Sequence, residues 1–154
     1  MSLHVRLVGP GRPNLLFMHG LFGQGRNWAG IAQGLLPEAT SLLLDLPDHG
    51  HSPWSDHFSY IDMADAVAHD LRERLGSAAA ITLVGHSMGG KVAMVLALRH
   101  PELVKGLVVV DIAPDDTSHG YGFGHIVNAL RSLELDELTS REEASEEIAD
   151  EVPD

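Results

Sequence analysis

A serine held between glycines is the feature of this sequence best suited to covalent chemistry. Residues 85–89 read Gly-His-Ser-Met-Gly, directly after the apolar run Ala80–Val84 and directly before a helix-like stretch. A serine at a sharp strand-to-helix turn has a strained backbone, and its neighbours must be glycines because the chain there packs too closely for a Cβ. The pattern predicts a nucleophile elbow with Ser87 as nucleophile. It also places the Met88 amide at the first turn of the helix, as a donor to a developing oxyanion.

A second glycine-rich segment can supply the other oxyanion donor. The apolar strand Leu15–His19 runs into Gly-Leu-Phe-Gly at residues 20–23. Acyl transfer needs two backbone N–H donors on the developing negative charge, and a loop of this kind provides the second one. We expect the Leu21 amide to be that donor. Phe22 and His86 are expected in the substrate pocket, with His86 pointing away from the Ser87 hydroxyl.

A serine nucleophile also needs an imidazole base and a carboxylate that orients it. Asp111 is a candidate acid because it ends a strand at the same sheet edge as Ser87. The acid could instead follow the next strand, which this chain does not contain. Among ten histidines, His119 and His125 are the two that follow both Ser87 and Asp111 in the chain, as the usual order of serine, acid and histidine requires.

The surrounding elements alternate between strand and helix, which predicts an α/β fold with a doubly wound, mostly parallel sheet. The helix after residue 59 has the clearest signals, with Ser59 as N-cap, Asp62 as its capping-box partner and Gly76 as terminator. Apolar stretches predict the strands Leu3–Val8, Leu15–His19, Thr40–Leu46, Ala80–Val84 and a buried strand Lys105–Val110. The helices are predicted at Asn27–Leu36, Ser59–Gly76 and Met88–His100.

These motifs resemble the α/β-hydrolase superfamily, and within it the small YbfF-like and ABHD11-like esterases. The resemblance rests on His-Gly-Leu-Phe-Gly at 19–23, Asn27-Trp28, Asp-Leu-Pro-Asp-His-Gly-His-Ser at 45–52, Gly-His-Ser-Met-Gly-Gly-Lys at 85–91 and Val-Asp-Ile-Ala-Pro at 110–114. It implies that Asp45 and Ser52 are structural, with His51 where the family usually has a second glycine. It also implies that His19 stabilises its own loop.

The resemblance further implies that the chain is the amino-terminal part of such an enzyme. We expect residues 1–114 to form part of the hydrolase core and residues 115–154 to begin a helical cap, with amphipathic segments at Ile126–Leu133 and Ser140–Ala149. The family places its catalytic histidine after the last core strand. A carboxy-terminal fragment of the same enzyme, supplying that histidine, is therefore the expected partner.

Composition narrows the class of protein. There are no cysteines, which excludes disulfides, thiolate nucleophiles and cysteine metal sites, and fits a cytoplasmic location. The net charge is −12, and residues 134–154 hold ten acidic residues and one basic residue. This acidic stretch is expected to be a solvated helix face, and it disfavours nucleic acids and anionic membranes as partners. We expect no cofactor, no metal and no membrane-spanning segment.

Two functional classes follow from these residues. The first is a serine esterase or related acyl hydrolase that acts on a small-molecule ester through an acyl-Ser87 intermediate, with thioesterase or serine haloperoxidase-like activity as variants. The second is a non-catalytic ligand-binding module on a hydrolase scaffold. The strained elbow favours the enzyme, because a binding module has no use for it.

Overall fold

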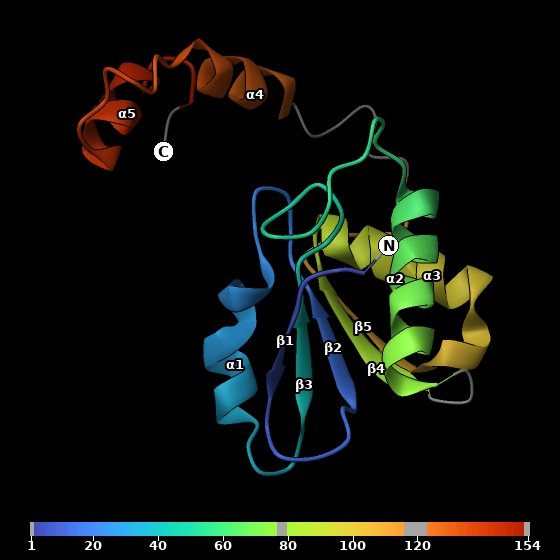
Figure 1. Ribbon diagram of the computed structural model, residues 1–154. Coiled ribbons are helices and arrows are strands. Elements are labelled where there is room, and N and C mark those ends of the chain that lie inside the picture. The colour runs from blue at the N-terminus through green and yellow to red at the C-terminus, as the bar shows by residue number, and fades with distance from the viewer. Residues whose placement is uncertain (1, 77–79, 116–122, 153–154) are drawn as a thin grey trace. The chain divides into compact units, whose positions relative to one another are not determined.

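A computed structural model describes residues 2–76, 80–115 and 123–152 of the chain (Figure 1). The chain divides into two compact units, Met1–Pro114 and Asp115–Asp154. The first unit contains a twisted sheet covered by helices on both faces. The second unit contains two short helices, and each unit is described by itself.

The sheet of the first unit has five strands in the order β1-β3-β2-β4-β5. Strand β1 is antiparallel to β3, and the other neighbouring strands are parallel. A short turn with no helix joins β1 to β2, whereas helical connections link the parallel strands. The prediction of a mostly parallel α/β sheet is confirmed. The strands are β1 Val5–Val8, β2 Leu15–Met18, β3 Ser41–Leu44, β4 Ile81–His86 and β5 Val104–Val110.

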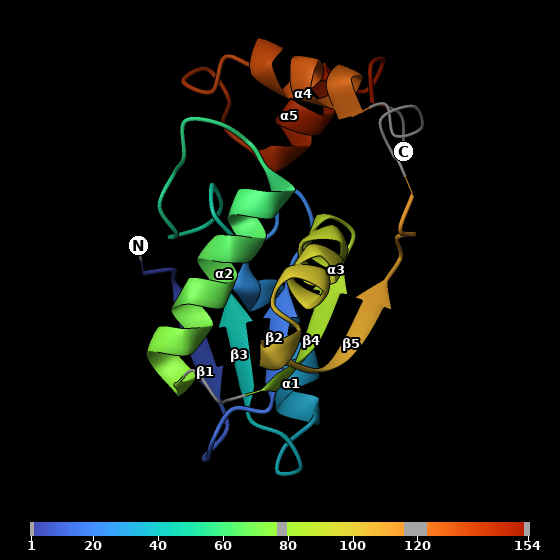
Figure 2. The ribbon, with the colours of Figure 1, turned by 90° about the vertical axis from the view of Figure 1, so that its right-hand side faces the viewer.

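Helices cover both faces of this sheet. Helix α1 lies on one face, and α2 and α3 lie side by side on the other (Figures 1 and 2). The predicted helix at residues 27–36 forms as a 3₁₀ turn followed by a short α-helix, because Gly25 starts the turn earlier and Gly34 ends the helix. The helices are η1 Gly25–Trp28, α1 Ala29–Gly34, α2 Tyr60–Leu75, α3 Met88–Arg99 and η2 Pro101–Leu103.

Alternating strand residues fill two apolar cores, one on each face of the sheet. In β2, Leu16 and Met18 face the larger core with α2 and α3, whereas Phe17 faces the smaller core with Ala32 of α1. Successive side chains of a strand point to opposite faces, so a strand covered on both sides is apolar throughout. This is why the central strands read as continuous hydrophobic runs.

Helix α2 begins and ends as the sequence predicts. The Ser59 hydroxyl accepts a hydrogen bond from the Asp62 N–H at 3.2 Å, and Gly76 follows the last turn with φ of 84°. The capping box is only half formed, because the Asp62 carboxylate bonds the His57 ring at 2.8 Å and is not seen to return to the N-cap amide.

An ion cluster joins α2 to α3. Asp65 of α2 accepts two hydrogen bonds from the Arg99 guanidinium, at 2.9 and 2.8 Å, and one from the His100 ring at 2.7 Å. The bonds from Arg99, and then that from His100, lower the pKa of the Asp65 carboxyl to about 2. The carboxylate therefore stays charged at any ordinary pH, and the helix contact remains intact.

Strand β5 differs from its prediction as a buried strand. It pairs only with β4 in the described part of the chain, and none of its residues is fully buried. Leu107 is 40 % exposed, Val108 is 47 % exposed and Val110 is 36 % exposed. The prediction failed because apolar composition does not reveal whether a strand has one neighbour or two.

The second unit contains helices α4 Phe123–Ser132 and α5 Arg141–Glu147, close to the predicted amphipathic segments. Ser140 caps α5 by accepting a hydrogen bond from the Glu143 N–H at 3.1 Å. The acidic residues of α5 are exposed, as a solvated helix face requires. None of the helices in the described ranges combines the length and low polarity needed to cross a lipid bilayer.

The central strand β4 offers a test of the two-sided core. Leu83 is fully buried, and Leu83→Ala is expected to lower the free energy of unfolding by about 2–5 kcal/mol, because it removes apolar contacts and leaves a cavity. The matched control is Leu98→Ala at a side chain that is 84 % exposed, which should change stability by less than about 0.5 kcal/mol. Urea denaturation followed by circular dichroism measures both, and similar losses would contradict this description of the core.

Candidate functional site

The turn at Ser87 is a strained feature of the sheet edge. Strand β4 ends at His86 and α3 begins at Met88, so one residue makes the whole turn. Ser87 has φ of 49° and ψ of −116°, a conformation that costs a non-glycine residue about 1–3 kcal/mol. Its N–H donates to the Val110 carbonyl at 3.0 Å, and its carbonyl accepts from the Lys91 N–H at 3.1 Å. The predicted strand, turn and helix around Ser87 are therefore present.

The flanking glycines allow three backbones to meet at this turn. A Cβ on Gly89 would lie 2.6 Å from the Met18 carbonyl oxygen and 2.5 Å from that of His19. A Cβ on Gly85 would meet the Gly89 carbonyl, and one on Gly90 would lie 2.6 Å from Ile112. Real Cβ atoms do not approach backbone this closely, so a side chain at Gly85 or Gly89 would push α3 away from the sheet, whereas one at Gly90 would displace the Ile112 side chain.

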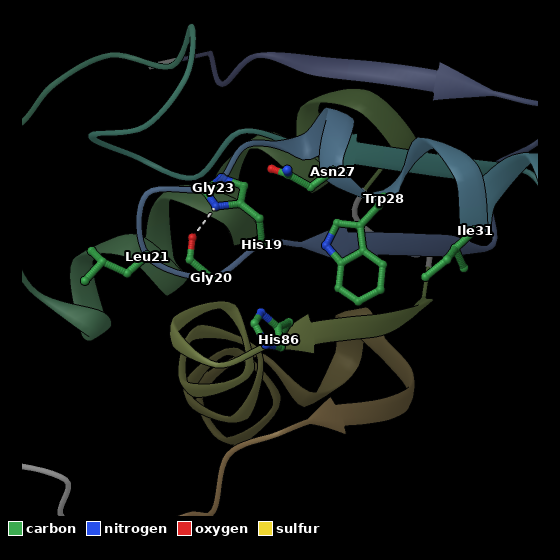
Figure 3. Close-up of a pocket in the computed structure, with 8 residues that line it drawn as sticks. All are labelled: His19, Gly20, Leu21, Gly23, Asn27, Trp28, Ile31 and His86. Carbon is green, nitrogen blue, oxygen red and sulfur yellow. Dashed lines mark hydrogen bonds between the residues drawn. The ribbon is translucent and has the colours of Figure 1, made fainter. Parts of the chain in front are cut away.

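The loop after β2 lies directly beside the serine. A Cβ on Gly20 would be 3.5 Å from the Ser87 Cβ and 2.9 Å from His86 Nδ1. A tight turn follows, in which the Gly23 N–H donates to the Gly20 carbonyl at 3.0 Å (Figure 3). Within the described ranges, neither the Leu21 N–H nor the Met88 N–H donates a hydrogen bond. These two amides remain able to bind a ligand oxygen.

His19 holds this loop in place. Its Nε2 accepts from the Leu46 N–H at 3.1 Å, so its Nδ1 carries the proton and donates to the Gly20 carbonyl at 2.8 Å. Burial lowers the pKa of His19, which keeps the ring neutral. Both ring nitrogens are occupied, so His19 stabilises the loop, as the resemblance implied, and is not a free base.

His86 and Asp111 lie together at the edge beside Ser87. In the pairing of β4 with β5, His86 is opposite Val110, which brings Asp111 to the end of the elbow. His86 Nε2 is 3.8 Å from the Asp111 carboxylate, and the Asp111 side chain is 86 % exposed. The expectation that Asp111 shares the edge with Ser87 is met. Its approach to His86 was not predicted, because it depends on the strand register.

A hollow of about 360 Å³ opens next to the Gly20 loop (Figure 3). Trp28 and Ile31 form much of its apolar wall, and Trp28 also packs against Phe17 with ring centroids 4.9 Å apart. Of the two residues expected in the substrate pocket, His86 lines this hollow, whereas Phe22 lies outside the lining and is 61 % exposed. The lining residues are His19, Gly20, Leu21, Gly23, Asn27, Trp28, Ile31 and His86.

Sequence reasoning missed Ile31 as a pocket residue, and it noticed Trp28 only as part of a motif. Their position depends on how η1 and α1 fold back over β2 and β4, which no local pattern encodes. The one available signal was an aromatic residue a few positions after the glycine loop. In such a fold the segment following that loop borders the same cavity.

Asp45 has a structural role next to the site, as the resemblance implied, because its carboxylate joins several segments. Its carboxylate accepts from the Gly25 N–H at 2.7 Å and the His51 N–H at 2.9 Å, and it contacts the His4 ring. Burial alone would raise the pKa of the Asp45 carboxyl, but these N–H donors, with His4, hold the pKa below its ordinary value. The carboxylate is therefore ionised, and it fixes the start of η1 beside the Gly20 loop.

The predicted structural role of Ser52 is also confirmed. Its hydroxyl donates to the Asp45 carbonyl at 2.5 Å and accepts from the His4 N–H at 2.9 Å. Gly50, at φ of 56°, packs against the Asp45 carboxylate, where a side chain has no room.

The two candidate bases, His119 and His125, both belong to the second unit. His119 lies outside the described residues, and His125 is an exposed residue of α4. Within the described ranges, no side chain is hydrogen-bonded to the Ser87 hydroxyl. A base for the serine is thus not identified among these residues.

Comparison with known proteins agrees with this geometry. Residues 13–141 match the family described as alpha/beta hydrolase fold. The chain is 38 % identical over 136 residues to the sn-1-specific diacylglycerol lipase ABHD11 of Mus musculus, covering 86 % of this chain and 43 % of that protein. It is 39 % identical over 114 residues to Lipase LipV of Mycobacterium tuberculosis, covering 73 % of this chain and 42 % of that protein.

A solved structure described as a marine microorganism esterase superposes with a TM-score of 0.87 at 34 % identity, covering 99 % of this chain and 59 % of that one. The chain spans less than half the length of the two curated relatives named above. Lipases and esterases among the relatives support ester hydrolysis as the activity of this group. With the strained Ser87 turn and the glycine loop beside it, these similarities show that the chain belongs to the α/β-hydrolase fold family.

Proposed function

We propose that this chain carries the nucleophile of a serine-dependent carboxylic ester hydrolase. The observation that carries the proposal is the backbone of Ser87, held at φ of 49° between β4 and α3 and next to Gly20. Strain of this size persists where it serves a purpose, and the purpose of an elbow is to expose a hydroxyl at the sheet edge.

In the proposed reaction, Ser87 Oγ attacks the ester carbonyl carbon and its proton passes to a base. The carbonyl oxygen becomes an oxyanion, which the N–H groups of Leu21 and Met88 bind, assisted by the positive end of the α3 dipole. The tetrahedral intermediate then releases the alcohol, which takes the proton from the base. Water attacks the acyl-Ser87 ester in the same way, and releases the carboxylic acid and the free serine.

The pocket suggests an ester with an apolar group. Leu21, Trp28 and Ile31 line the hollow beside the oxyanion loop, and its volume of about 360 Å³ suits a small acyl or alcohol group. Two relatives are named as lipases, and one of those names specifies diacylglycerol. A small uncharged ester is therefore the substrate we propose, without a cofactor.

We propose Asp111 as the acid of the triad, because it ends β5 beside the elbow. Its exposed carboxylate is accessible to an incoming imidazole. A carboxylate on a further strand is the alternative, since many hydrolases take the acid from there. Asp111→Asn distinguishes the two, because the rate of ester hydrolysis falls only if Asp111 is the acid that sets the tautomer of the base.

We propose that the catalytic histidine comes from polypeptide beyond these 154 residues. Relatives of about twice this length support the proposal, as does the apolar exposed edge of β5, where a further strand could pair. Residues 115–154 are proposed as the beginning of a helical cap, and a cytoplasmic location remains a prediction.

A non-catalytic ligand-binding module is the second candidate. One observation favours it, namely that no base for Ser87 is identified in the described part of the chain. Fluorophosphonate labelling of the chain together with the polypeptide that supplies the histidine separates the two, because an activated serine forms a covalent adduct and an idle one does not. A panel of oxygen esters, thioesters and peroxide-dependent halogenation then separates esterase from thioesterase or haloperoxidase-like activity.

In the protein that also contains the polypeptide supplying the histidine, Ser87→Ala is expected to abolish ester hydrolysis and fluorophosphonate labelling. Loss of a triad nucleophile lowers the rate by on the order of 10⁶ in a comparable hydrolase. Hydrolysis of p-nitrophenyl acetate and intact mass after labelling measure the loss, with Ser55→Ala, at an exposed loop serine, as the control that keeps activity. If Ser87→Ala retained more than a few per cent of activity, another residue would be the nucleophile.

Gly20→Val is expected to lower the acylation rate by about 10² or more. A Cβ there would lie 2.9 Å from His86 Nδ1, so the His86 ring or the loop that carries the Leu21 amide must move. Leu21→Ala and Met88→Ala keep both backbone donors. Leu21→Ala should alter the choice of ester more than the rate, because Leu21 lines the hollow, whereas Met88→Ala should act mainly by lowering stability, because Met88 is buried in the core. Pre-steady-state burst kinetics measure acylation directly, and equally mild effects of all three changes would mean that the loop is only a turn.

The purified 154-residue chain alone is expected to hydrolyse p-nitrophenyl acetate far more slowly than an ordinary enzyme, whose kcat is about 10 s⁻¹. Without a histidine base only the oxyanion donors and binding remain, which still gives about 10³–10⁴ over water. Intact mass spectrometry first shows that no second polypeptide is present. Full turnover by the chain alone would redirect the search for the base to His119 and His125.

A further inference from the structure

A second group of chemistry-bearing side chains lies away from Ser87, where β1 begins and β3 ends. It consists of His4, Asp45 and His51, which come from three separate segments of the first unit. His4 Nδ1 is 2.9 Å from Asp45 Oδ2, and His51 Nδ1 is 3.5 Å from the same oxygen. The hydrolase reaction uses none of these side chains.

The spacing of the three ligand atoms matches a metal coordination shell. One nitrogen or oxygen from each residue lies within 4.8 Å of the others. Zinc binds nitrogen at about 2.0–2.1 Å and oxygen at about 2.0–2.2 Å, so tetrahedral ligands stand about 3.4 Å apart. The His4 and His51 rings are 49 % and 75 % exposed, which leaves both of them room to turn toward one point.

The backbone around the cluster is already fixed. The Asp45 N–H donates to the His4 carbonyl at 2.9 Å, and Ser52 bridges the His4 amide and the Asp45 carbonyl. The Gly25 and His51 N–H groups orient the buried carboxylate. A ligand set held by such outer hydrogen bonds loses little freedom when an ion binds.

The donor set also identifies the class of ion. Two imidazoles and one carboxylate, with a fourth position open to water, suit zinc and neighbouring divalent transition metals, whereas calcium and magnesium prefer oxygen ligands alone. We propose that His4, Asp45 and His51 form a Zn²⁺ site, separate from the hydrolase centre. Binding replaces the proton on His4 Nδ1, and the neutral ring then carries its proton on Nε2.

Other histidine–carboxylate contacts within the described ranges lack this combination. His57 and Asp62 are both exposed and offer two ligands. His100 shares Asp65 with the Arg99 guanidinium, which repels a cation. In contrast, the Asp45 carboxylate is 4 % exposed, and its described partners are two amides and two imidazoles.

The test measures zinc binding to the 154-residue chain without a histidine tag, after chelator treatment and desalting. Competition with a chromophoric chelator should give one tight Zn²⁺ per chain, and the thermal midpoint should rise with zinc concentration. His4→Gln and His51→Gln should each weaken that binding by about ten-fold or more. His57→Gln, at an exposed histidine already paired with an aspartate, is the control and should bind as the unaltered chain does.

If His4→Gln is poorly folded, His51→Gln decides the question. The His51 ring is 75 % exposed, so its removal should not disturb the fold, and the backbone N–H of residue 51 still donates to Asp45. Circular dichroism without zinc verifies that each variant is folded. The proposal is overturned if the unaltered chain binds no zinc at about 1 mM, or if His51→Gln and His57→Gln bind with the same affinity as the unaltered chain. These results do not depend on Ser87, so they are independent of the proposed hydrolase activity.

Discussion

The site depends on how closely α3 approaches the end of β2. The helix begins so near the Met18 and His19 carbonyls that position 89 has no room for a side chain. This contact places the start of α3 beside the loop after β2, because that loop begins where the helix touches the strand. The two amides proposed to bind an oxyanion come from these two segments, so their separation is set by backbone packing and not by flexible side chains.

A second layer of polar contacts holds the loop after β2 in place. His19 joins the Gly20 loop to the end of β3, and Asp45 at that same end joins η1 to the turn at 47–53. Each of these groups is buried and hydrogen-bonded, so removing one would leave its partners unsatisfied in a place water does not reach easily. The reactive loop is thus supported by residues that never contact a substrate.

Much of this arrangement is predictable from the sequence, where the determinants are local. The turn at Ser87 follows from glycines within two residues of it, and the caps of α2 follow from Ser59 and Gly76. The structural roles of His19 and Asp45 came from resemblance, since their partners lie 27 and 20 residues away. The His4–Asp45 contact was not foreseen, because it joins residues 41 positions apart that meet only through strand pairing. The burial of β5 also depends on the whole sheet, because its apolar sequence does not show whether a second strand lies beside it.

The division of the chain after Pro114 has a consequence for how such a protein can change over evolution. The described residues of both apolar cores of the sheet all lie in the first unit, before residue 105. The packing that supports the turn at Ser87 is therefore encoded by one continuous stretch of sequence. We expect selection for this packing to act on the first unit as a whole, because a change at any of its core positions alters the same two layers of side chains.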